Sequence, residues 1–288
     1  MKLLTYSMKG RDFAGVLDST GQNILPIEKY SSMQELIESG VTASEVSGLA
    51  KQSGKSVPLS DVTKRPPIPH PKQEIICLAL NYSDHVKEAA KADEKSFGEK
   101  YNHAVYFCKR VSEAIADGGI IPGHWELTEN TLDYENELAL IIGKDAFHVS
   151  REDAYDYVFG YMVFNDVTAR NLQKRHSQFY FGKSLDGFCP MGPWIVTEDE
   201  FSRPPSLRLH TRVNGESRQT GNTDMMIFDI PHIISELSKG ITLKAGTIVA
   251  TGTPSGVGMG FSPPQYLKPG DVVECEVEKI GILRNEVR

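Results

Sequence analysis

Short hydrophobic runs bounded by turn residues recur along most of the chain, and they are typical of β-strands. Residues 272–278, V-V-E-C-E-V-E, alternate strictly, so that two valines and Cys275 share one face and three glutamates share the other. Three further runs are apolar almost throughout: residues 137–143, 157–165 and 193–197. Many strands and few helices predict a β-rich core that is closed or folded on itself.

Helical patterns are fewer, and each has recognisable ends. Residues 31–40 have serines at the start and Gly40 at the end. Residues 81–91, N-Y-S-D-H-V-K-E-A-A-K, also favour a helix. In residues 229–240, Asp229 is the candidate N-cap and proline lies in the first turn. The polar, aperiodic stretch from about 87 to 103 begins within the second of these helices, and we interpret it as a mobile lid.

A proline-rich segment divides the chain into two predicted parts. Four prolines lie in residues 66–71, which excludes a central strand or a helix interior there. We therefore predict a small N-terminal α+β domain at residues 1–65, a linker at 66–71 and a larger domain at 72–288. With 288 residues, the chain is long enough to bury a large core without disulfide bonds or structural metals.

Composition excludes several classes of function. The net charge of −7 gives no basic surface for nucleic acid or for an anionic membrane. The four cysteines form no C-x-x-C pair, so neither a disulfide framework nor a thiolate zinc site is expected. The first residues lack the apolar run of a signal peptide, and no run approaches the ~18 apolar residues of a membrane span. A cytoplasmic protein is the expectation.

Two glutamates, Glu135 and Glu137, lie one residue apart at the start of an apolar run. On a strand they would project from the same face, roughly 7 Å apart at the backbone. At an effective dielectric constant near 20, their repulsion would be about 2.4 kcal/mol. An exposed edge strand would avoid this cost through solvent screening. Alternatively, a cation binds both, and Asp166 after the next apolar run would supply a third carboxylate. Such a set suits Mg²⁺ or Mn²⁺, with Ca²⁺ as an alternative.

Four blocks in this order resemble the fumarylacetoacetate hydrolase family: D-Y-E-N-E-L-A-L-I-I-G-K, F-N-D-V-T-A-R-N-L-Q, G-K-S-L-D-G-F-C-P-M-G-P-W and T-G-T-P-S-G-V-G. The resemblance covers about residues 70 to 288. It implies a β-rich α+β protein, with a mixed β-roll as the C-terminal domain and a small, variable N-terminal domain. It also implies that Glu135, Glu137 and Asp166 hold one divalent metal ion, and that the protein is a homodimer.

The resemblance extends to the other candidate site residues. A further family block matches N-Y-S-D-H-V-K-E, and in it His85 and Glu88 form a water-activating dyad. Residues three positions apart on a helix lie on the same face, so this spacing suits such a pair. By the same match Lys183 faces the reacting oxygen. The implied substrate-binding residues are Tyr82, Arg170, Gln173 and Thr253. Phe107, Lys109 and Ser112 match a block that supports the pocket. Leu80 stands where many relatives carry arginine, so the pattern does not predict a carboxylate contact at that position.

These matches imply a metal-dependent hydrolase that cleaves a carbon–carbon bond in an acylpyruvate such as fumarylpyruvate or acetylpyruvate, with a role in aromatic catabolism. In this mechanism His85 activates water and Lys183 stabilises the oxyanion. Two other activities need the same metal but no attacking water: oxaloacetate decarboxylation, and isomerisation of 2-hydroxyhepta-2,4-diene-1,7-dioate. A non-catalytic protein that binds a metal and a 2-oxo acid is a further alternative, because a fold does not determine a function.

Overall fold

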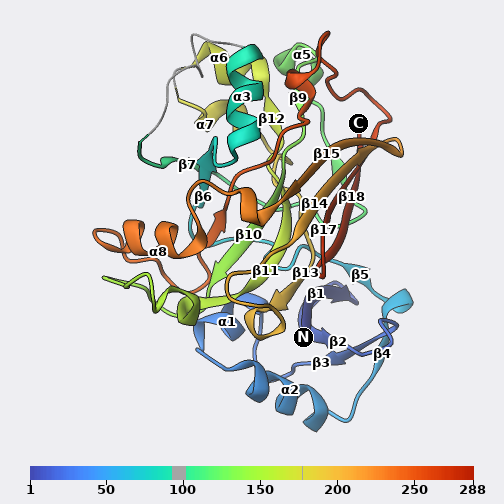
Figure 1. The fold of residues 1–288 in the computed structure, drawn as a ribbon. Coiled ribbons are helices and arrows are strands. Elements are labelled where there is room, and N and C mark those ends of the chain that lie inside the picture. Colours follow the sequence, from blue (N-terminus) through green and yellow to red (C-terminus); the bar gives the residue numbers. More distant parts are fainter. Residues whose placement is uncertain (93–101, 177) are drawn as a thin grey trace.

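A large mixed sheet runs through the computed structural model, which describes residues 1–92, 102–176 and 178–288. A five-stranded sheet packs beside it, and a two-stranded sheet lies near its end (Figure 1). The large sheet has the order β4 (Val57–Pro58), β3 (Asn23–Pro26), β2 (Arg11–Leu17), β1 (Lys2–Met8), β13 (Met191–Thr197), β11 (Val158–Asn165), β10 (Asn136–Ile142), β16 (Ile248–Ala250), β6 (Ile75–Ala79) and β7 (Val105–Lys109), with β5 (Thr63–Lys64) paired to β1.

The remaining elements are short. The five-stranded sheet has the order β15 (Glu216–Asn222), β14 (Arg208–Val213), β17 (Val272–Val277), β18 (Gly281–Val287) and β8 (Ile120–Ile121); the two-stranded sheet joins β12 (Thr168–Ala169) to β9 (Leu132–Asp133). The described helices are α1 (Met33–Glu38), α2 (Ala43–Gln52), α3 (Ser83–Ala92), α5 (Trp125–Thr128), α6 (Arg170–Arg175), α7 (Tyr180–Lys183) and α8 (Ile230–Ser238). Mixed sheets with few helices confirm the predicted fold class.

Strand β10 is apolar on both faces because both faces are covered. Leu138, Leu140 and Ile142 belong to the core between the large sheet and the five-stranded sheet. Ala139 and Ile141 point to the other face, into a second core that includes residues of α1 and α2. Each such buried leucine or isoleucine contributes about 1.5–3 kcal/mol. The strand is therefore held at the centre of the molecule, and the charged residues at its start are held with it.

The predicted elements are found close to their expected positions. In β17, Val273, Cys275 and Val277 are buried while the glutamates between them are less so, as the alternation indicates. Helix α8 begins after Asp229, whose side chain accepts a hydrogen bond from the His232 N–H. Helix α2 is not among the predicted elements, although Thr42 and Glu45 form a capping box at its start, which is a recognisable sequence signature.

The predicted N-terminal domain shares the large sheet with the rest of the chain. Strand β1 pairs antiparallel with β13, and the N-terminal strands continue the sheet from there (Figure 1). The proline-rich segment contains no helix or strand, but Pro66, Pro67 and Ile68 are buried, and Thr5 donates a hydrogen bond to the Pro67 carbonyl. The segment therefore packs against the sheet, and the division at 65 and 72 stays a prediction.

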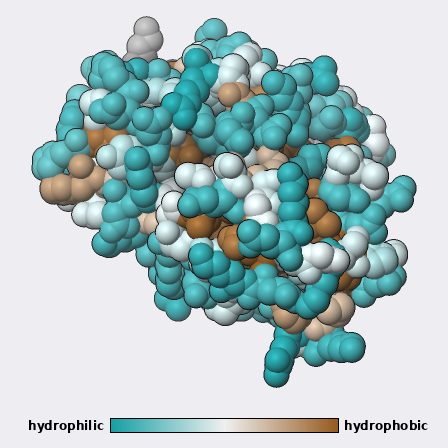
Figure 2. Space-filling view, turned by 90° about the horizontal axis from the view of Figure 1, so that it is seen from below, coloured by the Kyte–Doolittle hydropathy of each residue, from teal (hydrophilic) through white to brown (hydrophobic). Residues whose placement is uncertain are grey.

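The surface seen from below is largely hydrophilic, with separate hydrophobic areas rather than one continuous patch (Figure 2). Among the described helices, none has the length and apolar character needed to cross a bilayer. Helix α3 runs from Ser83 to Ala92, so residues 87–92 of the predicted lid are helical, and residues 93–101 of that lid lie outside the described residues.

Candidate active site

Three carboxylates lie close together at the edge of the large sheet where β10 begins and β11 ends. Asn136 pairs with Asn165, so Glu135 and Asp166 are neighbours across the two strands, and the Asp166 N–H donates to the Glu135 carbonyl at 2.8 Å. One oxygen from each of Glu135, Glu137 and Asp166 lies within 4.8 Å of the others. Glu135 and Glu137 are only 6% and 1% exposed, so the exposed edge strand is the wrong alternative for this pair.

Two buried lysines contact this carboxylate cluster. Lys183, in α7, donates to Glu135 Oε2 at 2.9 Å, Asp166 Oδ2 at 2.8 Å and Thr168 Oγ1 at 2.8 Å. Lys109, at the end of β7, contacts the other oxygen of Asp166 and donates to the Val167 carbonyl at 3.0 Å. Lys183 and Lys109 are 2% and 0% exposed, respectively, so both ammonium groups stay within the site. Family matching had given Lys109 a supporting role only, without a partner.

Arg170 approaches the same cluster from the start of α6. Its Nη1 lies 2.7 Å from Glu135 Oε1 and donates to Gln173 Oε1 at 3.0 Å. Its Nε donates to Asp133 Oδ2 at 2.8 Å, and Asp133 is a fully buried residue that the sequence interpretation missed. The remaining nitrogen, Nη2, is buried and has no hydrogen-bond partner among the described residues. Arg170 is therefore fixed at three points and free at one.

His85 and Glu88 form a hydrogen-bonded pair on α3. His85 Nδ1 lies 3.0 Å from Glu88 Oε2, so the ring is oriented with Nε2 away from the glutamate. The other Glu88 oxygen, Oε1, accepts a hydrogen bond from the Gly256 N–H at 2.8 Å. The i, i+3 spacing thus places both side chains on one helix face, as predicted. His85 is 6% exposed, so the pair is not the incidental surface pair that helix spacing alone would also allow.

A narrow cavity connects these groups. It is lined by His85, Glu135, Arg170, Gln173, Lys183 and Thr253, and its apolar wall consists of Leu78, Ala79, Leu80, Ala89, Phe107, Phe179 and Met259.

The two remaining predicted substrate-binding residues, Thr253 and Tyr82, differ in position. Thr253 is held by a bond from Gln219 Nε2 at 2.7 Å and donates to the Asn136 carbonyl at 2.9 Å. Tyr82 is fully buried and does not line this cavity, and its hydroxyl has no hydrogen-bond partner among the described residues.

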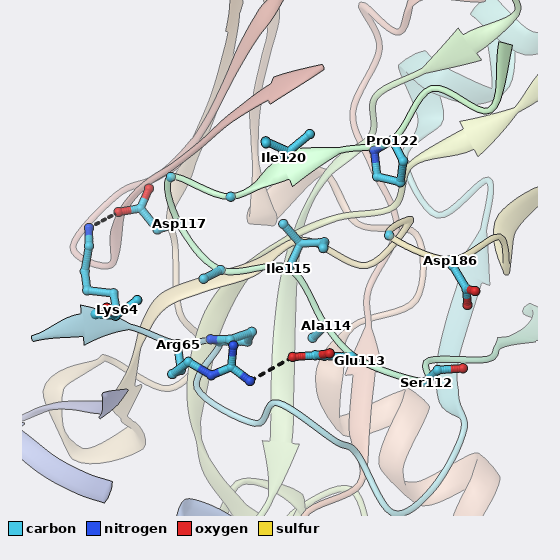
Figure 3. A pocket seen from close by; sticks show the side chains of 16 residues that line it. Lys64, Arg65, Ser112, Glu113, Ala114, Ile115, Asp117, Ile120, Pro122 and Asp186 are labelled. Carbon is cyan, nitrogen blue, oxygen red and sulfur yellow. Dashed lines mark hydrogen bonds and ion pairs between the residues drawn. The ribbon is translucent and has the colours of Figure 1, made fainter. Parts of the chain in front are cut away.

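A much larger hollow lies elsewhere, beside the N-terminal strands. Four of its five charged lining residues are paired with one another: Lys64 contacts Asp117, and Arg65 Nη2 lies 2.7 Å from Glu113 Oε1 (Figure 3). Ser112 lines this hollow and not the narrow cavity. Because none of the three clustered carboxylates lies there, we place the chemistry in the narrow cavity despite its size.

Charge and burial perturb the ionisable groups of the site. Burial, together with the nearby Asp166 and Glu135, raises the pKa of Glu137 well above its ordinary value. Burial also opposes the charged form of Glu135, but Lys183 and Arg170 outweigh it and lower the pKa of Glu135 to about 2. For Lys183, Asp166 and Glu135 outweigh burial and raise the pKa of the ammonium group. Lys183 is therefore a persistent cation and a poor base.

The carboxylate cluster fits a hard divalent cation. An octahedral Mg²⁺ with ligands at ~2.1 Å separates them by about 3 Å at adjacent positions and about 4.2 Å at opposite ones, and Ca²⁺ tolerates wider spacing. The three oxygens lie within 4.8 Å of one another, which is close to this range. They are all carboxylate oxygens, which are the ligands such ions prefer. A cation among them would also remove the repulsion that raises the pKa of Glu137.

A model of the fumarylacetoacetate (FAA) hydrolase C-terminal family matches residues 74–288. The chain belongs to the fumarylacetoacetate hydrolase family. A relative in Bacillus subtilis, oxaloacetate tautomerase YisK, is 49% identical over 229 residues, which are 80% of this chain and 74% of the relative. A fumarylacetoacetate hydrolase from Exiguobacterium antarcticum is similar in structure, with a TM-score of 0.84, 41% identity and coverage of 100% of this chain and 99% of that one.

Another family structure adds information about metals. Maleylpyruvate hydrolase from Sphingobium, solved in complex with manganese(II) ion and pyruvate, has a TM-score of 0.76 and 29% identity, with 100% of this chain and 98% of that one covered. Together with the carboxylate cluster, this related structure supports metal binding by the present chain. The relatives differ in reaction, so membership of the family does not choose among tautomerase, isomerase and hydrolase.

Proposed function

We propose that this protein is a divalent-metal-dependent enzyme that interconverts the enol and keto forms of oxaloacetate. The observation that carries the proposal is the 49% identity to an oxaloacetate tautomerase over 80% of the chain. The geometry agrees with it, because His85 of the proton-transfer dyad, the Lys183 ammonium group and Glu135 of the carboxylate cluster line one cavity. Like oxaloacetate decarboxylation and the diene-dioate isomerisation, the two alternatives in the sequence analysis, this reaction needs the metal ion but no attacking water. In this respect it differs from acylpyruvate hydrolysis.

Glu135, Glu137 and Asp166 would hold the metal ion. A bound Mg²⁺ or Mn²⁺ would supply Lewis-acid stabilisation of negative charge on the 2-oxygen of the substrate. The Lys183 ammonium group, kept protonated by Asp166 and Glu135, would face the same developing charge. It would act through charge alone, since its raised pKa keeps it protonated and makes proton release unfavourable.

His85 would carry the proton to and from carbon 3. In the keto-to-enol direction, Nε2 takes a proton from carbon 3, the C–H electron pair forms the C2–C3 double bond, and the carbonyl π pair moves onto oxygen. That oxygen takes a proton from water, and the His85 imidazolium returns its proton to solvent. Glu88 holds the opposite ring nitrogen, Nδ1, at 3.0 Å and favours the imidazolium that forms. The Gly256 N–H holds Glu88 in turn. Arg170, whose Nη2 is unpaired among the described residues, would bind a substrate carboxylate.

The experiment follows the ultraviolet absorbance of enol-oxaloacetate as it converts to the keto form. We expect the Mn²⁺-loaded protein to accelerate the decay, chelation to abolish the acceleration, and no pyruvate to be released. Release of pyruvate in step with oxaloacetate loss would instead identify a decarboxylase. No acceleration by protein that demonstrably contains Mn²⁺ would overturn the proposal.

Acylpyruvate hydrolysis is the second candidate, and the His85–Glu88 pair is the observation that favours it. A dyad of this kind can deprotonate water, which tautomerisation does not need. The similarity to a maleylpyruvate hydrolase supports the same reading. Turnover of acetylpyruvate or fumarylpyruvate, measured beside oxaloacetate on the same preparation, decides between the two. A kcat/KM for an acylpyruvate above that for oxaloacetate would make hydrolysis the main activity.

A further inference from the structure

Asp133 gathers four hydrogen bonds at the edge of the proposed active site, although it lines neither the cavity nor the metal cluster. Its side chain accepts from Arg170 Nε at 2.8 Å, from the N–H groups of Gly258 and Met259 at 2.6 and 3.0 Å, and from the Tyr134 N–H at 2.9 Å. The residue is 0% exposed. A buried carboxylate whose partners come from three separate segments holds those segments in one arrangement.

The bond to Arg170 determines which guanidinium nitrogen remains available. Asp133 occupies Nε, and Glu135 and Gln173 occupy Nη1. Nη2 is left buried, without a hydrogen-bond partner among the described residues. An unpaired buried N–H of a charged group is costly, and a ligand carboxylate would satisfy it. Arg170 lines the cavity, so the ligand can reach it there.

We propose that Asp133 is a positioning residue that turns Arg170 Nη2 toward the substrate and so makes the site selective for a short 2-oxo acid with a second carboxylate. The inference rests on the proposed function, in which the first carboxylate and the 2-oxygen lie at the metal. Nη1 of the same guanidinium contacts Glu135, a proposed metal ligand, at 2.7 Å. The second carboxylate must therefore bind close to the first, which favours a four-carbon diacid.

Asp133 fixes a second wall of the cavity through the same carboxylate. It accepts a hydrogen bond from the N–H of Met259, a residue that also lines the cavity. The positions of Arg170 and Met259 are therefore coupled. A variant at Asp133 should alter recognition of the second carboxylate while the metal ligands, which do not contact Asp133, keep their geometry.

Malate and lactate are the test ligands, because they differ by one carboxylate and are chemically stable. Their affinities are measured by titration calorimetry on Mn²⁺-loaded protein, and Mn²⁺ affinity is measured separately. We expect the wild-type protein to prefer malate by tenfold or more. Asp133→Asn should weaken the affinity for malate about tenfold, since an amide cannot accept hydrogen bonds from all these donors. The affinities for lactate and for Mn²⁺ should change by less than threefold.

Two further variants make the outcome decisive. Arg170→Lys keeps the charge but loses the planar guanidinium group, and it should show the same selective loss of affinity for malate. This variant provides the test if Asp133→Asn does not fold. Asp117→Asn is the matched control, because Asp117 is also an ion-paired carboxylate that accepts a backbone N–H, that of Arg284 at 2.9 Å, but outside the cavity. It should leave the malate preference unchanged.

Equal loss of malate and lactate in Asp133→Asn, or no preference for malate in the wild type, would overturn the inference. Because these measurements need no turnover, they are separate from the test of the proposed function. A protein that prefers malate through Arg170 and Asp133 but does not tautomerise oxaloacetate would retain the inference and lose the proposed activity.

Discussion

Two buried lysines, Lys109 and Lys183, contact the same carboxylate, Asp166. Together with Arg170 they supply three positive charges around Glu135, Glu137, Asp166 and Asp133. Isolated buried charges would be strongly unfavourable, whereas paired and hydrogen-bonded ones are tolerated. Glu137 is the exception, because it accepts a hydrogen bond from the neutral Gly252 N–H, while burial and the neighbouring carboxylates raise its pKa. The cluster therefore has the donor set for a cation.

Glu137→Gln tests the metal site with little disturbance of the fold. The Gly252 N–H donates to Glu137 Oε2 at 2.7 Å, and a glutamine oxygen can accept the same bond. We expect Mn²⁺ affinity to fall at least tenfold, or about 1.4 kcal/mol, while the metal-free protein keeps its melting temperature. Calorimetric Mn²⁺ titration and thermal unfolding are the measurements. In the wild type, Mn²⁺ at 100 times its Kd should stabilise the protein by about 2.7 kcal/mol. Unchanged affinity in the variant would remove Glu137 from the ligand set.

His85→Ala tests the dyad. It removes no proposed metal ligand, so Mn²⁺ affinity should be unchanged, while kcat for tautomerisation should fall by roughly 10²–10⁴, the usual contribution of general acid–base catalysis. Glu88→Gln should have a milder effect in the same direction, since it keeps a hydrogen bond to the ring but loses the charge that favours imidazolium.

The matched control for the dyad is His232→Ala. His232 and Glu236 form a comparable pair on α8, with Nε2 3.2 Å from Oε2, but they do not line the cavity. This variant should keep full activity. If His85→Ala retained wild-type kcat for oxaloacetate and for an acylpyruvate, the pair on α3 would have no part in the mechanism.

At the scale of elements, the segment from Thr253 to Gly260 joins the two halves of the site. Gly256 donates to Glu88 on α3, and Gly258 donates to Asp133 on β9. The chain turns here into the short helix η5 (Gly258–Gly260), in which Gly258 lies against Asp133 and Gly260 lies against Glu88. A Cβ at Gly260 would lie 2.1 Å from Glu88 Oε1, so no larger residue fits without moving Glu88.

Gly260→Ala should therefore reduce activity more than stability. The displaced atoms belong to the flexible end of Glu88, which would lose its bond to the Gly256 N–H, to His85 or to both. We expect kcat to fall about tenfold or more, which is part of the roughly 10²–10⁴-fold rate contribution attributed to the dyad. The free energy of unfolding should fall by about 1 kcal/mol or less. Gly240→Ala is the control, since its added Cβ meets nothing within 4 Å. Equal kcat in both variants would contradict the proposed contact.

At the scale of the whole molecule, the N-terminal strands complete the sheet that carries the site. Leu3, Leu4 and Tyr6 on β1 are at most 1% exposed. Leu3 shares a core with Ala139 and Ile141 of β10 and with Met191 and Ile195 of β13. The core behind the metal cluster is thus built from both predicted domains.

Residues 72–288 expressed alone should therefore fail to form a stable monomer. Each lost apolar side chain removes about 1.5–3 kcal/mol of burial, against a typical total stability of about 5–15 kcal/mol. The exposed edge of β13 would also promote aggregation. Light scattering and binding of a hydrophobic dye are the measurements, and restoration by co-expressed residues 1–71 is the control. A monomeric fragment that unfolds cooperatively and binds Mn²⁺ would instead show that the predicted catalytic domain is independent.

The sequence by itself determined the features that depend on short separations. Alternation predicts β17, cap residues predict α8, and spacings of two and three place Glu135 beside Glu137 and His85 beside Glu88, because side-chain direction repeats with the backbone period. Only the tertiary structure decided the partners of those groups. Asp133 meets Gly258 across 125 residues and Lys109 meets Asp166 across 57, while Ser112 faces a different hollow. These contacts follow from strand register and loop packing, which bring together residues that no local period relates.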